Sequence, residues 1–253
     1  MAPNGEIRVI PVPLAAEILP GDDLAEKLAA ALQHQKLKLE PGDVVVVKHK
    51  IVSKAEGRLV RLDSVKASPA AQAWSRRAGT DARVIELALS ESKRVVRKKK
   101  GVLITETRHG FICANSGVDV SNVDGGESAV LLPEDPDRSA ANLRVRLKRK
   151  FGKNIAVIIS DSFGRPWREG LTEVAIGVAG MKSIVDYRGR RDPHGYPLHA
   201  SCEAVADEVA CTAGLVCGKL NRTPVCIVRG FAFQNGRGSA RELIRPAKND
   251  LFR

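Results

Sequence analysis

The stretch that decides the fold reads Val157-Ile158-Ile159-Ser160-Asp161-Ser162-Phe163-Gly164-Arg165-Pro166-Trp167-Arg168. It opens with a short apolar run rich in β-branched residues, which predicts a buried strand. The polar residues that follow predict a turn at the carboxyl end of that strand, where sheets commonly present side chains to a ligand. The alternative is an ordinary polar turn with solvated arginines. The stretch therefore gives a candidate site at one edge of a sheet.

The residue types in this turn suit a phosphate or carboxylate ligand. Asp161 and Ser162 offer hard oxygen atoms, which Mg²⁺ and Mn²⁺ prefer. Arg165 and Arg168 offer forked N–H donors that match carboxylate and phosphate groups. Together these four residues predict a site for an anionic substrate and a divalent cation.

The composition fits a globular protein that binds anions. The chain has 253 residues, of which 43% are hydrophobic and 28% charged, enough for one large domain or two modest ones. Its formal net charge of +12 favours nucleic acid, phosphorylated metabolites or acidic substrates as partners. Only 4% of residues are aromatic, which argues against a stacking surface for single-stranded nucleic acid.

Two basic runs, Lys93–Lys100 and Arg144–Lys150, are expected at the ends of helices, where cations complement the helix dipole. The five cysteines have no metal-binding spacing and indicate reduced thiols in a cytoplasmic protein. The sequence shows no signal peptide and no apolar run of membrane-spanning length, so we expect no membrane association.

The order of the expected elements favours a mixed α+β fold over a doubly wound sheet. No GxxxxGK[ST] loop and no GxGxxG motif after a strand is present, so neither a P-loop nor a Rossmann site is expected. No clear linker divides the chain, and we expect one domain over residues 1–253. We expect strands at about 6–14, 44–47, 102–105, 110–113, 157–159 and 225–229. We expect a helix that starts at Gly21-Asp22-Asp23 and carries the apolar stripe Leu24, Leu28 and Leu32, and further helices at about 69–78, 82–97, 139–150 and 202–216, the last capped by Ser201.

Two further polar stretches follow expected strands. Val44–Val47 leads into Lys48–Arg58, whose lysines can act as point charges on phosphate groups, although solvated lysines are the plainer interpretation. Cys113 leads into Ala114–Gly126, where Asp119 is a second candidate carboxylate and Asn122 a candidate donor to a nucleotide. The alternative for this second stretch is a common Asn/Asp/Gly turn cluster.

Taken in order, three motifs and a run of small residues resemble the coenzyme F420-0:L-glutamate ligase family. They are Val52-Ser53-Lys54-Ala55-Glu56-Gly57-Arg58, Asn115–Val123, Ser160–Arg168 and Ala175–Gly180. The resemblance runs from Gly21-Asp22-Asp23 to about residue 232, and the chain looks like a stand-alone ligase without the reductase-like domain fused to some members.

The resemblance implies GTP-dependent amide-bond formation between L-glutamate and F420-0, followed by a γ-linked glutamate, with release of GDP and phosphate. It implies Mg²⁺ or Mn²⁺, K⁺ as a candidate monovalent cation, two interleaved lobes and a homodimer. An acyl phosphate intermediate fits this chemistry, because a carboxylate must be activated before an amine can attack it.

The resemblance also assigns candidate site residues. Asp119, Asp161 and Ser162 match the family's metal ligands, with Asp161 also taken as catalytic. His49, Lys50, Lys54 and Asn122 match positions that line the nucleotide, and the segment ending at Ile18 adds backbone contacts. From their chemistry, Arg165 and Arg168 are expected to hold acidic groups of the substrate.

One departure concerns Lys219. Archaeal members place an acidic or amide residue there as a further metal ligand, whereas a lysine ammonium cannot coordinate a metal. We therefore expect Lys219 to contact the nucleotide, either with a metal ligand lost or with the ammonium replacing part of the charge of a cation.

Three other functions remain open from the sequence. A metal-dependent phosphohydrolase could use Asp119 and Asp161 to activate water. A divergent ligase could act on another acidic substrate. An RNA-binding protein would account for the positive charge, but the sparse aromatic residues and the acidic groups after the strands count against it.

Overall fold

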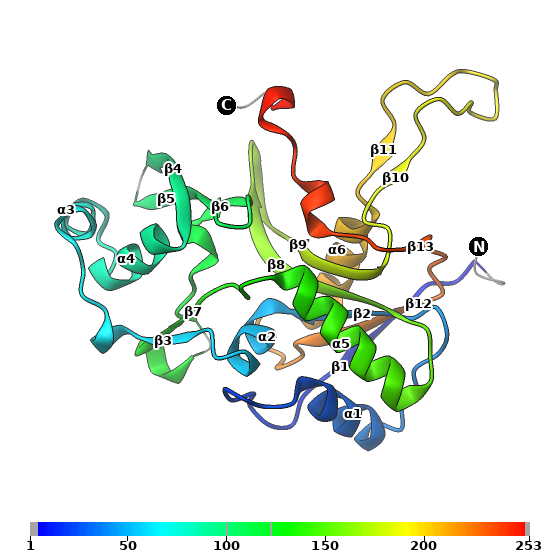
Figure 1. Ribbon diagram of the computed structural model, residues 1–253, viewed down its shortest axis with the longest axis horizontal. Coiled ribbons are helices and arrows are strands. Elements are labelled where there is room, and N and C mark those ends of the chain that lie inside the picture. Colours follow the sequence, from blue (N-terminus) through cyan, green and yellow to red (C-terminus); the bar gives the residue numbers. More distant parts are fainter. Residues whose placement is uncertain (1–4, 100, 122, 251–253) are drawn as a thin grey trace.

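The computed structural model describes residues 5–99, 101–121 and 123–250. Within them the chain has the expected mixed α+β fold, built on a six-stranded sheet in the order β1-β12-β2-β8-β9-β13 (Figure 1). The elements are β1 (Arg8–Val12), α1 (Leu24–His34), β2 (Val44–Lys48), α2 (His49–Ala55), β3 (Leu59–Arg61), α3 (Pro69–Ala78), α4 (Ala82–Ser90), β4 (Ser92–Lys99), β5 (Val102–Thr107), β6 (Ile112–Ala114), β7 (Ser128–Val130), α5 (Pro136–Phe151), β8 (Ala156–Arg165), β9 (Arg168–Met181), β10 (Val185–Asp186), β11 (Cys202–Glu203), α6 (Val205–Cys217), β12 (Val225–Arg229) and β13 (Asn235–Gly236).

The centre of this sheet is the parallel pair β2 and β8, and the other neighbouring strands are antiparallel. Helices α5 and α6 cover opposite faces of the sheet (Figure 1). Because both faces are covered, strands such as Val44–Val47 and Val157–Ile159 are apolar without alternation. The parallel pairing brings the carboxyl ends of β2 and β8 to the same edge of the sheet.

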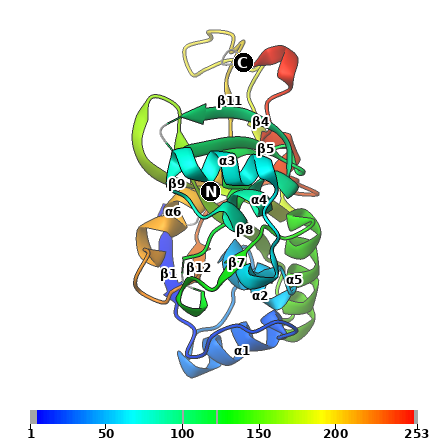
Figure 2. The same ribbon diagram turned by 90° about the vertical axis from the view of Figure 1, so that its left-hand side faces the viewer.

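A second, smaller hydrophobic cluster lies beside the hydrophobic core of the six-stranded sheet. Helices α3 and α4 pack with the three-stranded sheet β4-β5-β6, as Figure 2 shows from the side. The short pair β3–β7 joins this part to the central sheet. The residues that form the smaller cluster are Leu62, Ala71, Val84, Ile85, Leu87, Ala88, Leu103, Val118, Ala129 and Leu131.

Several helix ends are where their capping residues place them. The Asp23 side chain accepts the N–H of Glu26 at the start of α1, as predicted. Ser68 caps α3, and Gly79 closes it in the left-handed conformation. Gly152 closes α5 in the same way, but that helix begins at Pro136 rather than at 139.

Three expectations about elements were wrong. The helix expected over 82–97 ends at Ser90, because the β-branched Val95 and Val96 lie in strand β4, whose basic side chains are exposed. The run beginning at Lys93 is therefore not at a helix end. Ser201 does not cap α6, because Cys202 and Glu203 first pair with β10.

The third error concerns the deciding stretch itself. Strand β8 does not stop at Ile159 but continues to Arg165, because these residues pair with β9 in a long hairpin. The polar residues expected in a turn are therefore strand residues, and their side chains alternate between the two faces of the hairpin.

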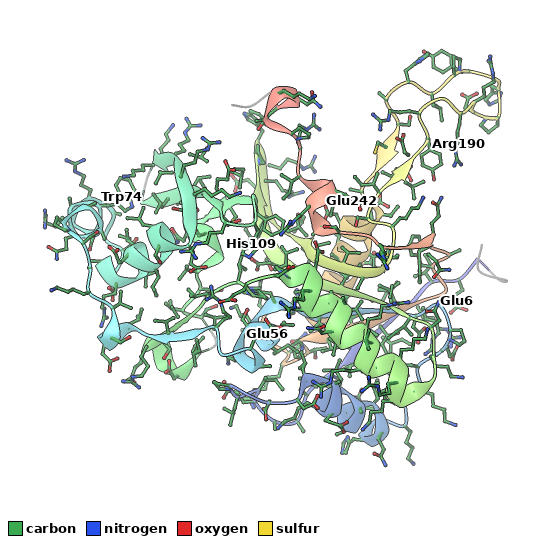
Figure 3. The ribbon with its side chains drawn as sticks, viewed as in Figure 1. Glu6, Glu56, Trp74, His109, Arg190 and Glu242 are labelled. Carbon is green, nitrogen blue, oxygen red and sulfur yellow. The ribbon has the colours of Figure 1, made fainter. Side chains whose placement is uncertain are left out.

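An exposed arm leaves the sheet between β10 and β11, and Arg190 marks it in Figure 3. The Arg190 guanidinium lies 5.6 Å from the centre of the Tyr187 ring, and the Asp192 carboxylate accepts the N–H groups of His194 and Tyr196. In the part of the chain that the structure describes, no helix is both long and apolar enough to cross a membrane.

The contact between β9 and α5 gives a stability prediction. A Cβ atom on Gly177 would lie 2.3 Å from the carbonyl oxygen of Pro136, whereas one on Gly164 of the same hairpin would meet nothing closer than 3.9 Å. We expect Gly177→Ala to lower the free energy of unfolding by about 1–3 kcal/mol through overpacking. Denaturant unfolding measures this, with Gly164→Ala as the matched control. Equal stability of the two variants would contradict the close packing of α5 on β9.

Candidate active site

The first part of the site forms where β2 ends beside Ser160 of the longer strand β8. Lys48 pairs with Ser160 across the parallel strands, so the residues that follow them, His49 and Asp161, are brought together. His49 Nε2 lies 3.3 Å from Asp161 Oδ1, and the same oxygen accepts the N–H of Ser162 at 2.7 Å. The His49 side chain is buried, and its Nδ1 lies 3.5 Å from Ser53 Oγ.

A second carboxylate reaches this edge from the loop after β6. Asp119 Oδ2 lies 2.7 Å from Lys50 Nζ, and Asp119 Oδ1 accepts the N–H of Ser121 at 2.7 Å. Lys50 also donates to the carbonyl and hydroxyl oxygens of Ser121. His49 and Lys50 are consecutive in α2, and the charge of Asp119 acts on Asp161, which is consistent with the predicted closeness of the two carboxylates. We call His49, Lys50, Asp119 and Asp161 the carboxylate cluster.

The surroundings keep both carboxylates ionised. Burial raises the pKa of Asp161, but the charge and hydrogen bond of His49 and the N–H of Ser162 outweigh it, so the pKa lies below its usual range. The negative charge of Asp119 opposes this lowering, which indicates that the two carboxylates interact. For Asp119, burial again raises the pKa, while Lys50 and Ser121 lower it further, with a net decrease.

A second cluster lies on the other face of the hairpin and centres on Glu173, which the sequence analysis missed. Its Oε1 accepts the hydroxyl of Ser162 at 2.6 Å, and its Oε2 accepts that of Ser160 at 2.9 Å. Lys48 forms an ion pair with Glu173, and Lys219 Nζ donates to Ser162 Oγ at 2.7 Å. Burial raises the pKa of Glu173, but Lys48 and the two serines lower it more.

We call this second group the ammonium cluster. Glu173 belongs to it because it pairs with Ser162 across the β8–β9 hairpin. The turn residues between Gly164 and Gly170 were the available signal, since a hairpin closed there brings positions 162 and 173 together.

Asp161 and Ser162 therefore serve different clusters. Successive strand residues point to opposite faces, so Asp161 faces His49 while Ser162 faces Glu173 and Lys219. The Lys219 ammonium beside the Ser162 hydroxyl opposes a cation at the same oxygen. Ser162 remains a predicted metal ligand that this contact disfavours.

The other predicted nucleotide residues occupy varied positions. Lys54 is buried at 8% exposure and its Nζ lies 2.6 Å from Glu17 Oε1, next to the segment expected to give backbone contacts. The Ile18 side chain belongs to the hydrophobic core, so only its backbone could face a ligand. Asn122 lies outside the described residues.

The two arginines lie at the tip of the hairpin instead of beside Asp161. Arg165 pairs with Arg168 there, and Arg165 Nη2 donates to the carbonyl oxygen of Glu169 at 2.6 Å. Arg165 lies four positions after Asp161, roughly 13 Å further along β8. The structure therefore does not bring Arg165 and Arg168 into the carboxylate cluster.

The carboxylate cluster suits a divalent cation bound together with phosphate. Among the residues that the structure describes, no three His, Cys, Asp or Glu side chains are grouped as a complete metal site. Mg²⁺ is commonly held by one or two carboxylates, with substrate phosphates and water completing its six ligands. Asp119 and Asp161 fit that pattern, because they come from separate parts of the chain and their charges interact.

Comparisons with known proteins agree on one family. The model of the F420-0:Gamma-glutamyl ligase family matches residues 14–230. A protein of Methanopyrus kandleri named Coenzyme F420:L-glutamate ligase is 44% identical over 252 residues, which cover 98% of each chain. Proteins of the same name from Methanothermobacter thermautotrophicus and Methanocaldococcus jannaschii are 44% and 41% identical, and the alignments cover 92% and 85% of this chain and 93% and 86% of theirs.

The lowered pKa of Asp161 predicts how stability depends on pH. A carboxyl group with a depressed pKa stabilises the fold above its unfolded value of about 3.9, and this contribution is lost as the pH falls through the folded value. We expect Asp161→Asn to be less stable than the wild type at pH 7, with the difference shrinking as the pH falls below about 4. Urea unfolding between pH 7 and pH 3 measures it.

Asp207 provides a control in which stability should change with pH in the opposite direction. Burial raises its pKa, so its charged form costs stability at neutral pH and the cost disappears on protonation. The wild type should therefore gain stability relative to Asp207→Asn as the pH falls. A constant difference between wild type and Asp161→Asn at every pH would contradict the lowered pKa.

Proposed function

This chain belongs to the F420-0:gamma-glutamyl ligase family, and we propose that it joins L-glutamate to coenzyme F420-0 by an amide bond and then adds a γ-linked glutamate, using GTP. The names of its relatives support the acceptor and the amino acid. The observation that carries the proposal is the carboxylate cluster, in which α2 holds Asp161 and Asp119 side by side through His49 and Lys50.

The proposed reaction has two steps. A carboxylate oxygen of the acceptor attacks the γ-phosphorus of GTP, the bond from that phosphorus to the bridging oxygen breaks, and GDP leaves. The amine nitrogen of glutamate then attacks the carbonyl carbon of the acyl phosphate. Inorganic phosphate departs, and the amine releases its proton to solvent.

Such a reaction asks the protein mainly to position the groups and to neutralise charge. Lys50 and Lys54 stand one helical turn apart on α2, where they can follow a chain of phosphates, and Lys219 approaches from the other face of β8. Mg²⁺ or Mn²⁺ held by Asp119 and Asp161, with K⁺ as an additional candidate, would neutralise phosphate charge and orient the γ-phosphoryl group. His49 fixes the Asp161 carboxylate for this task.

The proposal also includes a homodimer, which the resemblance of the sequence motifs implies. Arg165 and Arg168 are kept as contacts for acidic groups of the substrate at the projecting hairpin tip. Their distance along β8 from Asp161 assigns them to substrate binding instead of phosphoryl transfer.

The test is product analysis. Incubation with F420-0, GTP, Mn²⁺ and L-glutamate should give masses increased by one and then two glutamyl groups, as seen by mass spectrometry, with GDP formed in step. Phosphate release that needs no glutamate, without glutamylated product, would instead support the phosphohydrolase.

The same assay tests the carboxylate cluster. Asp161→Asn should lower kcat at least about 100-fold while the protein stays folded, because it removes charge that is needed as phosphate charge develops. Asp63→Asn, which changes an exposed carboxylate paired with Arg61 in another part of the fold, is the matched control. Near-normal glutamylation by Asp161→Asn would remove that residue from the mechanism.

A separate prediction concerns Lys219. If its ammonium contacts the nucleotide, Lys219→Gln should raise KM for GTP about 10-fold, the cost of losing one charge-assisted contact. The exposed Lys153 precedes the opposite end of β8, so Lys153→Gln serves as the control. Steady-state kinetics with varied GTP measures both variants, and an unchanged KM in Lys219→Gln would exclude the contact.

A further inference from the structure

A hollow of about 220 Å³ adjoins the carboxylate cluster and plays no part in the phosphate chemistry described above. Its walls come from the β5–β6 turn, the β8–β9 hairpin, α6 and the C-terminal segment. Figure 3 labels His109 and Glu242, which precede two of these walls in the chain. The hollow thus lies where the two hydrophobic parts of the protein and its C-terminal segment meet.

The position of the hollow ties it to Asp161. Val174, which lines the hollow, is the direct cross-strand partner of Asp161. Phe163, which also lines it, stands two residues after Asp161 on the same face of β8, about 7 Å further along the strand. A ligand seated in the hollow would therefore extend directly toward the carboxylate cluster.

The lining favours a flat aromatic ligand. The rings of Phe111 and Phe163 lie edge to face with centres 6.2 Å apart, and Val174, Leu243 and Ile244 add aliphatic surface. Aromatic rings prefer to pack against such edges and faces. An apolar cavity of about 150 Å³ holds benzene, so this hollow can take a larger fused ring while the rest of the ligand extends outside it.

The polar groups at the hollow are few. The Asp207 carboxyl lines it and accepts the N–H of Ala175 at 2.8 Å, and Arg245 and Asp250 are the other charged residues that line it. A guanine base carries several donors and acceptors that would need partners, and so mostly apolar walls suit it poorly. The lysines suited to phosphates, Lys50, Lys54 and Lys219, are not among the residues that line the hollow. These features favour the acceptor over the nucleotide as occupant.

We propose that this hollow binds the fused aromatic ring of the acceptor, and that the acceptor's acidic tail runs along the β8–β9 hairpin to the carboxylate cluster. The inference rests on the proposed function, because it takes coenzyme F420-0 as the acceptor. That compound carries a flavin-like fused ring at one end and, at the other, the carboxylate that receives glutamate. Phe111, Phe163 and Ile244 are then the residues that recognise the ring.

The experiment fills the hollow and measures binding without turnover. The fluorescence of the F420-0 ring is titrated with protein in the absence of GTP and glutamate. Ile244→Trp should weaken binding at least about 10-fold, since it places a large side chain where the ring would lie. Leu215→Trp, at an 83% exposed position on α6, should bind like the wild type.

Phe163→Leu keeps the wall apolar but removes one ring, and serves if Ile244→Trp fails to fold by circular dichroism. It should weaken binding about 3- to 10-fold. In turnover, KM for F420-0 should rise in both variants, while KM for GTP, and KM for an acceptor analogue with the acidic tail but no ring, stay at the wild-type value.

The outcomes separate this inference from the proposed function. Ring binding that Ile244→Trp weakens, in a protein that forms no glutamylated product, would support the hollow and count against the ligase activity. Normal glutamylation together with wild-type F420-0 affinity in folded Ile244→Trp and Phe163→Leu would overturn the hollow as the ring site. A rise in KM for GTP instead of F420-0 would also overturn it.

Discussion

The parallel pairing of β2 with β8 is the constraint on which the site depends. Each strand is a buried apolar run, and neither could expose polar groups within the sheet without cost. Because the strands run in the same direction and in register, the first polar residue after each apolar run lies at the same edge of the sheet, with Lys48 opposite Ser160. An antiparallel pair would have sent His49 and Asp161 to opposite ends of the sheet. The hydrophobic effect that buries the two strands therefore also brings the imidazole to the carboxylate.

The sequence predicted several helix ends from local signals but predicted poorly where strand β8 ends. Asp23, Gly79 and Gly152 mark helix ends through local hydrogen bonds and backbone conformation, and such signals depend on few neighbours. The residues after Ile159 were expected in a turn because polar residues are typical of turns. The sequence alone does not show that a partner strand pairs with them. Strand β9 provides the pairing that keeps them extended.

The candidate site divides in the same way. Four site residues could be predicted because they follow apolar runs or belong to recognisable motifs. They are His49, Lys50, Asp119 and Asp161. Glu173 could not be predicted, since its role comes from its partner across the hairpin, Ser162. The turn residues between Gly164 and Gly170 could have indicated the hairpin with Arg165 at its tip, but they do not fix the register that places Glu173 opposite Ser162.

A register shift in the hairpin separates the two clusters. Ile159 pairs with Gly177 but Ser160 pairs with Ala175, so Ile176 is an extra residue on β9. Such bulges are common next to active sites, where they redirect side chains. A slip of one residue moves a side chain to the other face, so without the extra residue Glu173 would face the side of Asp161.

A third carboxylate would then join Asp119 and Asp161, whose charges already oppose each other. With the bulge, Glu173 instead holds Lys48 and, through Ser162, Lys219, on the face covered by α6. The Asp161 carboxylate therefore lies on one face of β8, and the ammonium groups of Lys48 and Lys219 gather at the other. A transferring phosphoryl group needs both, because its metal ions need carboxylates and its oxygens need cations.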